Sequence, residues 1–236
     1  MRISKNKILT SPSDLNNFVG CKFLIKNEIK FLNREIQKNK ESIDQKLWKE
    51  FGIKHEKKHF DLLKKYYKKN ISIKQDSTEE QRYKETIDAI KRGYDLIYHA
   101  FLIDEDFRGE ADFLIKVNTV SDLGDYSYEV IDTKYSNKPK PDHIIQLGMY
   151  TYMLEGTQGI LPKKFTIVLK DMVKEDVQVN QVNEFFKTHR KNYEKFILRN
   201  PIIVIFVITP MNAKKYGRRT IILIKLLKLT DLKLKN

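Results

Sequence analysis

Hydrophobic and polar positions divide the chain into a helical first part and a strand-rich second part. In the first part, apolar residues recur every three or four positions. This spacing predicts one or two helices over residues 11–36, a long helix over 45–69 and a third helix over 79–92. Ser11 and Ser13 are candidate caps for the first of these segments. The third segment begins with acidic and ends with basic residues, the arrangement that the helix dipole favours.

Short β-rich runs replace the helical pattern after Gly93. Val, Ile, Phe and Tyr gather between Gly, Asp and Asn residues, which predicts a sheet of at least four strands. The four runs are residues 94–103, 107–118, 126–136 and 163–172. An amphipathic helix is expected at 141–155, between the third and fourth runs. Helices flanking a central mixed sheet make an α/β or α+β domain, and we find no internal repeat.

The stretch YEVIDTKYS, residues 128–136, places two ionisable residues inside an apolar strand. Successive side chains on a strand alternate between its faces. Asp132 and Lys134 should therefore point one way, and Ile131, Thr133 and Tyr135 the other. Ionised groups directed at an interior cost free energy unless they are paired or bound to a metal. Taken alone, the pair is compatible with a buried salt bridge.

Four further polar residues lie where the pattern predicts burial. His55 is in the long helix, Asp112 lies between apolar neighbours, and Gln146 and Tyr150 share one helix face. Each alone has an ordinary structural explanation, as a solvated histidine, a turn residue or the edge of a helix. With the aspartate of the strand, however, two carboxylates and a histidine form an oxygen-rich site suited to Mg²⁺ or Mn²⁺. Such a metal polarises a phosphodiester and activates a bound water, while a nearby lysine offsets the developing charge.

The order and spacing of these residues resemble the motifs of the PD-(D/E)xK nuclease superfamily. The D-x-K pair alone is frequent by chance, but the chain also contains G-x-x-H-E, G-x-A-D-F and Q-x-x-x-Y. Within the superfamily, residues 10–200 are similar to the RecB-like branch. That branch includes CRISPR-associated single-strand exonucleases and nuclease modules fused to DNA helicases. The resemblance implies a restriction-endonuclease-like central mixed sheet flanked by helices, with an N-terminal helical region.

The resemblance also implies roles for individual residues. The metal ligands would be His55, Asp112, Asp132 and the backbone carbonyl of Ile131. Lys134 would be the catalytic lysine, acting together with the two aspartates. Gln146 and Tyr150 would position DNA and that lysine, and Glu56 would support the ligands from beside the histidine.

Composition and charge are consistent with a nucleic-acid partner without requiring one. The 236 residues include 45 Lys and Arg against 31 Asp and Glu, a formal net charge of +14. Such a surplus favours binding to polyanions, although an AT-rich gene also encodes many lysines without any such function. The one cysteine fits a reducing cytoplasm. No signal peptide or membrane span is visible, so we expect a cytoplasmic protein with no membrane partner.

Residues 201–236 form an aberrant basic and apolar tail after the nuclease-like domain of residues 1–200. The tail has eight basic residues and one acidic residue, so its own net charge is half of the +14 of the whole chain. Many RecB-like nucleases carry an iron–sulfur cluster held by one N-terminal and three C-terminal cysteines. Cys21 lies where the first would be and is a candidate remnant ligand, but one cysteine cannot hold a cluster.

A frameshift near residue 200 would explain the missing cysteines. Read from the third base of each codon, the gene segment for residues 202–213 is compatible with C-x-x-C-x-x-x-x-E-C. The hypothesis is that a shifted frame replaced a cluster-binding end. A genuine apolar strand followed by a basic helix is the alternative.

The leading functional prediction is a Mg²⁺- or Mn²⁺-dependent deoxyribonuclease. It would act as an exonuclease on single-stranded DNA or DNA ends, in repair, recombination or CRISPR-type defence, with helicase or CRISPR-type partner proteins. One alternative is a catalytically impaired nuclease-like module that binds nucleic acid without cutting it. A second is a membrane-surface or interaction protein that uses the Lys- and Leu-rich tail. All expected catalytic residues are present, which favours the enzyme.

Overall fold

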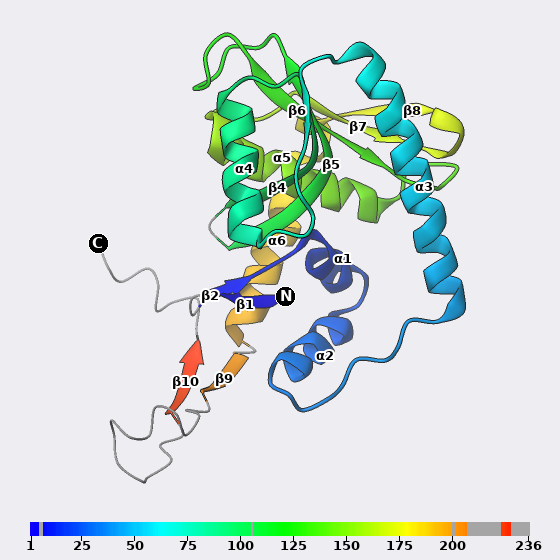
Figure 1. Ribbon diagram of the computed structural model, residues 1–236. Coiled ribbons are helices and arrows are strands. Elements are labelled where there is room, and N and C mark those ends of the chain that lie inside the picture. Colours follow the sequence, from blue (N-terminus) through cyan, green and yellow to red (C-terminus); the bar gives the residue numbers. More distant parts are fainter. Residues whose placement is uncertain (5–6, 105, 200–201, 207–222, 228–236) are drawn as a thin grey trace.

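A six-stranded mixed sheet is the centre of the described chain (Figure 1). The computed structural model describes residues 1–4, 7–104, 106–199, 202–206 and 223–227. In spatial order the strands are β3 (Asn70–Ser72), β4 (Leu96–Asp104), β5 (Phe107–Val117), β6 (Ser127–Thr133), β7 (Lys164–Val168) and β8 (Lys174–Gln178). β3 with β4 and β6 with β7 are parallel, and the other neighbours are antiparallel. The expected mixed α/β class with at least four strands is confirmed.

The described residues also form six α-helices. They are α1 (Pro12–Gly20), α2 (Lys22–Leu32), α3 (Ile43–Tyr66), α4 (Glu79–Lys91), α5 (Pro141–Gln158) and α6 (Val179–Arg199). Ser11, Ser42 and Thr78 begin α1, α3 and α4 with reciprocal capping boxes. Of the two candidate caps, Ser11 is therefore the cap and Ser13 lies inside the helix. The predicted helices are confirmed, but α6 was not predicted, although Phe186 and Tyr193 form part of a buried face on it.

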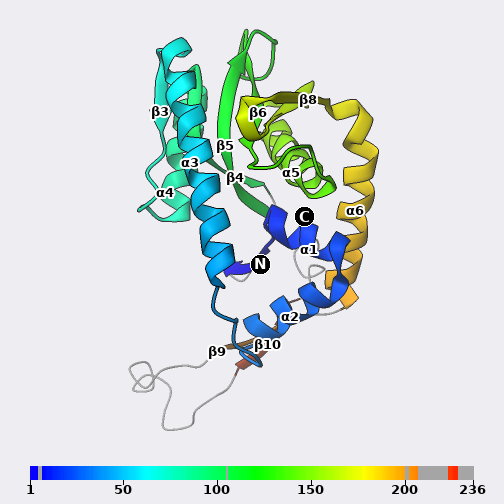
Figure 2. The ribbon, with the colours of Figure 1, turned by 90° about the vertical axis from the view of Figure 1, so that its right-hand side faces the viewer.

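Helices cover both faces of the sheet. In Figure 2, α3 and α5 lie on opposite sides of it, with α6 beyond α5. The larger buried cluster joins the sheet to α1, α4, α5 and α6, and a smaller cluster lies under the C-terminal half of α3. The smaller cluster consists of Leu63, Leu96, Phe113 and Ile115. The residues predicted to form the metal site come from α3, from the central strands and from α5.

The N-terminal segment is tied to the body of the fold. β1 (Arg2–Ser4) and β2 (Lys7–Leu9) form an antiparallel hairpin before α1. The amino group of Met1 pairs with the buried carboxylate of Asp14 at 2.6 Å. The expected N-terminal helical region is therefore present, as α1 and α2.

Two details of the predicted elements are wrong. The strand expected to reach Ser136 ends at Thr133, because the chain turns there and the Ser136 amide donates to the Lys134 carbonyl at 2.7 Å. On α3, the apolar residues at 47, 48, 51 and 62 are exposed, and only His55, His59 and Leu63 are buried. The N-terminal half of α3 extends past the sheet, so its apolar face meets no second layer among the described residues (Figures 1 and 2).

Only two short pieces of the predicted tail are described. β9 (Ile202–Phe206) and β10 (Leu223–Leu227) pair antiparallel with each other. The remaining tail, including most of the segment on which the frameshift hypothesis rests, lies outside the described residues. In the region where the alternative expects a basic helix, the described residues Leu223–Leu227 form a strand. Within the described ranges, no helix combines the length and apolar character that a membrane crossing requires.

Candidate functional site

Three polar residues form a row across the central strands. In the register of β4 and β5, His99 lies opposite Asp112. β5 and β6 pair as far as Phe113 and Ile131, so Asp112 and Asp132 follow at the next position, where the ladder ends. The strand register thus brings together two carboxylates that are twenty residues apart in sequence. This is the pair that the sequence predicted to converge.

The regular alternation of side chains along β5 is interrupted at this row. Ala111 and Leu114 pack in the same buried cluster, although residues three apart on a regular strand point to opposite faces. On β4, between the residues that pair with Phe113 and Ala111, His99 has a φ of +57°, in the left-handed region that non-glycine residues rarely adopt. Such strained residues often cluster at functional sites.

Asp132 is a fully buried carboxylate with an incomplete set of partners. Its side chain is 0% exposed, and its Oδ2 makes an ion pair with Lys134 Nζ. Neither carboxylate oxygen, however, accepts a hydrogen bond of good geometry from the described residues. Burial, followed by the charge of Asp112, raises the pKa of Asp132, and Lys134 only partly offsets this rise. Lys134 thus does not fully offset the cost of burying this charge beside Asp112.

The lysine itself stays protonated. Burial by itself would lower the pKa of Lys134, but the charges of Asp132 and Asp112 raise it above its ordinary value. The side chains of Lys134 and Asp132 point the same way, as predicted, and Tyr135 points to the opposite side, where it stacks on Phe51 of α3 at 5.5 Å between ring centroids.

Thr133 fixes the orientation of Asp112. Its backbone amide donates to Asp112 Oδ2 at 2.8 Å, and its hydroxyl donates to the same oxygen at 2.7 Å. Two donors on one oxygen hold the carboxylate toward the end of β6. The sequence did not single out Thr133, because its role depends on the register between β5 and β6.

His55 is held by the backbone of the sheet. Its Nε2 donates to the Val168 carbonyl at 3.2 Å, and this carbonyl also accepts the Lys134 amide at 2.8 Å. The edge of the imidazole meets the ring of Tyr135, with 5.7 Å between centroids. Since Nε2 carries the proton in this arrangement, Nδ1 is the nitrogen left to bind a cation.

The pKa of Glu56, the next residue of α3, is affected by the two aspartates. Burial, followed by the charge of Asp112, raises the pKa of Glu56 to about 7, and Asp132 adds to the rise. Its Oε1 lies 3.5 Å from His99 Nε2 and accepts no hydrogen bond from the described residues. The helix therefore presents a third carboxyl group to the same small region.

Two further histidines, His99 and His59, lie within the electrostatic influence of Asp112. The Nδ1 of His99 contacts Glu110 Oε1 at 2.6 Å, and burial lowers the pKa of His99 despite the charge of Asp112. Burial likewise lowers the pKa of His59 to about 4, helped by the charge of Lys174. Both imidazoles are therefore neutral at pH 7. Neither was named as a site residue from the sequence, since each is one polar position in an apolar run.

Gln146 and Tyr150 meet on α5, as their spacing predicts. Gln146 Nε2 donates to Tyr150 Oη at 3.2 Å, and burial together with Asp132 raises the pKa of Tyr150. The tyrosine ring packs against Gly109, where an added Cβ would lie 2.7 Å from its Cε1 atom. A side chain at position 109 would push the tyrosine out of place.

The last two predicted residues are less closely tied to this centre. Ile131 lies in the ladder, paired with Phe113 on one side and Thr166 on the other. Cys21 is exposed and free at the junction of α1 and α2.

The carboxyl groups fit a divalent cation. Among the described residues, no three His, Cys, Asp or Glu side chains already stand in a metal-binding arrangement. Asp132 nevertheless buries both carboxylate oxygens, one of which forms the ion pair with Lys134, and the charges of Asp112 and Asp132 both act on the carboxyl group of Glu56. Hard oxygen ligands of this kind suit Mg²⁺ and Mn²⁺.

No family model and no curated protein matches this chain. The side chains themselves therefore carry the functional inference. Their arrangement joins crowded carboxyl groups, a protonated lysine and neutral histidines where the pairing of β5 with β6 ends.

Proposed function

We propose that the chain is a metal-dependent nuclease of the PD-(D/E)xK superfamily, in its RecB-like branch, that hydrolyses DNA phosphodiester bonds on single strands or at DNA ends. The observation that carries this proposal is the meeting of Asp112 and Asp132 where the pairing of β5 with β6 ends, with Lys134 paired to the second carboxylate. The mixed sheet with helices on both faces agrees with the restriction-endonuclease-like fold that the proposal entails.

Asp112 and Asp132 would hold the divalent cation, and Glu56 is the neighbouring carboxyl group best placed to add an oxygen. When bound, the ion polarises the phosphodiester and lowers the pKa of a water molecule. Thr133 holds Asp112 in a fixed orientation throughout. Lys134 remains protonated, so it can orient the attacking water and offset negative charge on the phosphate.

The roles of the two α3 residues differ from the first expectation. His55 was predicted as a ligand, but its Nε2 is bonded to the Val168 carbonyl. Glu56 was predicted as a supporting residue, yet its pKa responds to both aspartates. We therefore assign Glu56 the more direct contact with the cation and His55 a contact through Nδ1.

A cleavage assay tests the proposal. Labelled single-stranded and double-stranded DNA are incubated with the protein in Mg²⁺, Mn²⁺ or EDTA. We expect metal-dependent cleavage that Asp132→Ala and Lys134→Ala reduce by about 100-fold or more. Lys164→Ala is the matched control, because Lys164 pairs with Asp176 at the edge of the sheet and should not affect cleavage. Cleavage that persists in the two site variants would refute the proposal.

The binding-module alternative gives a different result in the same assay. It predicts that DNA binds but remains intact with every metal. The protonated Lys134 beside paired aspartates favours the enzyme, because a pure binding surface has no need of buried carboxylates that repel phosphate.

A further inference from the structure

A row of aromatic rings leads from the surface of α3 to the candidate site. Trp48 is 62% exposed, Phe51 36% and Tyr135 38%. The centroids of Trp48 and Phe51 lie 6.1 Å apart, and the rings of Phe51 and Tyr135 stack almost in parallel, with 10° between their planes. The edge of His55 meets the other end of the row. The rings thus extend from solvent to a residue whose hydrogen-bond partner, the Val168 carbonyl, also accepts the amide of Lys134.

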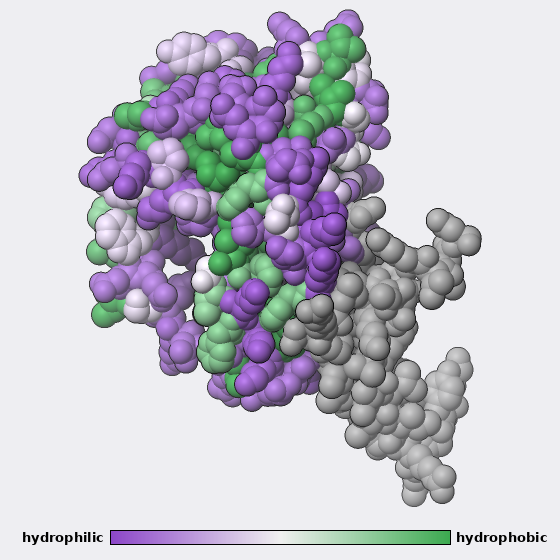
Figure 3. Space-filling model, turned by 180° about the vertical axis from the view of Figure 1, so that it is seen from behind, coloured by the Kyte–Doolittle hydropathy of each residue, from purple (hydrophilic) through white to green (hydrophobic). Residues whose placement is uncertain are grey.

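These rings have no partner layer among the described residues. The half of α3 that carries Trp48 and Phe51 stands away from the sheet (Figure 2). From behind, an opening is visible where this part of the molecule separates from the N-terminal helices (Figure 3). Leaving three neighbouring rings in contact with water costs free energy, because each ring has a large apolar surface.

Positive charge surrounds the same rings. A groove of about 490 Å³ is lined by Trp48, Tyr135 and three lysines, Lys138, Lys140 and Lys170. Lys170 Nζ lies 5.6 Å from the centroid of the Tyr135 ring. None of the three lysines forms an ion pair within the described part of the chain.

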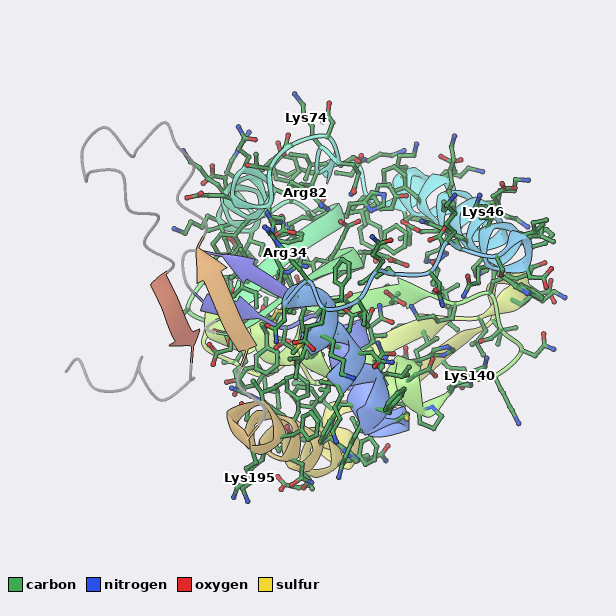
Figure 4. All side chains as sticks on the ribbon, turned by 90° about the horizontal axis from the view of Figure 1, so that it is seen from below. Arg34, Lys46, Lys74, Arg82, Lys140 and Lys195 are labelled. Carbon is green, nitrogen blue, oxygen red and sulfur yellow. The ribbon has the colours of Figure 1, made fainter. Side chains whose placement is uncertain are left out.

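The basic character continues beyond this groove. A neighbouring hollow on α3 is lined by Lys54, Lys57, Lys58 and Lys65, together with Asp61 and Leu62. In the view from below, Lys46 of α3 and Lys140 before α5 lie on the same side of the molecule (Figure 4). Exposed rings set among unpaired lysines match the two parts of a single-stranded nucleic acid, its bases and its phosphates.

We propose that Trp48, Phe51 and Tyr135 form a stacking platform for unpaired bases of single-stranded DNA, whose phosphates contact Lys138, Lys140 and Lys170. This inference rests on the proposed nuclease function and names the surface that guides the strand to it. The ring edge of His55 meets Tyr135, and its Nε2 shares the Val168 carbonyl with the Lys134 amide, so a strand held on the platform lies beside the end of β6, next to the candidate site. A DNA duplex keeps its bases stacked on one another and leaves no face for the rings.

The platform contains its own reporter, because Trp48 is the sole tryptophan of the 236 residues. A base stacked on an indole quenches its fluorescence. We expect oligothymidylate to quench the emission of Trp48 in EDTA, where no cleavage occurs, and blunt duplex DNA to quench it much less. The Asp132→Asn variant should show the same quenching, since it keeps the platform intact.

Anisotropy of a labelled oligothymidylate then measures the contribution of each ring. Trp48→Ala and Phe51→Ala should each weaken binding by about tenfold, whereas Trp48→Phe keeps most of it. Tyr66→Ala is the matched control, an exposed aromatic residue on the same helix outside the platform. An oligonucleotide of abasic units keeps the phosphates but lacks every base, so it should bind wild type more weakly than oligothymidylate binds Trp48→Ala.

The lysines give a separate signature. Lys140→Ala and Lys170→Ala should weaken binding of both oligonucleotides and make the affinity less sensitive to salt. Each variant is first checked for an unchanged thermal unfolding transition.

Three results would overturn the platform. The first is binding of oligothymidylate without quenching of Trp48. The second is equal affinity of wild type for the abasic and thymidylate strands. The third is an affinity of Trp48→Ala for oligothymidylate equal to that of wild type. Because these measurements use EDTA, they stand apart from the cleavage assay. Cleavage by wild type with no effect of the ring variants would reject the platform alone, and quenching by a protein that never cleaves would reject the nuclease alone.

Discussion

Asp112 and Asp132 lie opposite each other one position beyond the last pair of β5 and β6, and after burial the charge of Asp112 is the main cause that raises the pKa of Asp132. Lys134 is paired with Asp132, while Thr133 donates two hydrogen bonds to Asp112. The two carboxylates thus repel each other inside the fold unless a cation joins them.

Replacing Asp132 with Asn should stabilise the metal-free protein at pH 8. Because the pKa of Asp132 is raised in the folded state, the folded protein binds more protons than the unfolded chain between about pH 4 and that raised pKa. The contribution of this group to stability is therefore lost as the pH rises through that window. We expect urea unfolding in EDTA to show Asp132→Asn more stable than wild type at pH 8 and close to it at pH 4.

Asp176 provides the opposite control. Hydrogen bonds from Lys164 and Thr166 outweigh its partial burial and lower the pKa of Asp176. Asp176→Asn should therefore reduce stability at pH 8, and this loss should shrink as the pH falls below the ordinary aspartate pKa and through the lowered pKa of the folded state. Equal stability changes at both pH values for Asp132→Asn would rule out the linkage.

Removing the Thr133 hydroxyl should weaken metal binding without unfolding the protein. Thr133→Val loses the donor to Asp112 Oδ2 but keeps the backbone amide. We expect Mn²⁺ affinity, measured by calorimetry, to fall by about tenfold. Thr133→Ser retains the hydroxyl and should bind Mn²⁺ as wild type does. Equal loss in both variants would mean that packing of the methyl group, and not the hydrogen bond, positions Asp112.

Lys134→Met should separate catalysis from binding. The variant keeps the length of the side chain but leaves the buried carboxylate of Asp132 without its ion pair. We expect cleavage to fall by about 100- to 1,000-fold, and the metal-free variant to be less stable at pH 8 than wild type. Mn²⁺ should recover much of this stability by replacing the missing charge. Cleavage within about threefold of wild type would remove Lys134 from the chemistry.

Two glycines should respond in opposite ways to alanine. Gly109→Ala places a Cβ 2.7 Å from the Tyr150 ring and 3.1 Å from Pro12, so it should cost about 1–3 kcal/mol of stability. Gly52 lies inside α3 with no atom within 4 Å of an added Cβ, so Gly52→Ala should stabilise the protein by up to about 1 kcal/mol. Thermal unfolding measures both. A Gly52→Ala variant less stable than wild type would contradict the argument from helix propensity and open space at this position.

Local features of the site could be predicted from sequence. The alternation of side chains along one strand placed Asp132 with Lys134 and sent Tyr135 the other way, which the structure confirms. The four-residue spacing of Gln146 and Tyr150 gave their contact in the same manner. Each of these relationships depends on a single element, whose period the sequence shows directly.

Relationships between elements could not be predicted in this way. The contact of Thr133 with Asp112, and the place of His99 opposite Asp112, follow from strand register, which no single segment encodes. The exposure of Trp48 and Phe51 depends on how far α3 extends past the sheet, a property of the assembled layers. An apolar helix face therefore predicted burial where the described fold leaves these side chains exposed.

Direct binding of Mn²⁺ tests the central claim most sharply. Calorimetric titration of the metal-free protein at pH 7.5 should show Mn²⁺ binding to wild type and to the Asp176→Asn control. Asp112→Asn and Asp132→Asn should each lose that binding by at least about tenfold, because each removes one of the two opposed carboxylates. Unchanged Mn²⁺ affinity in both variants would contradict the account, since the two aspartates would then hold no metal.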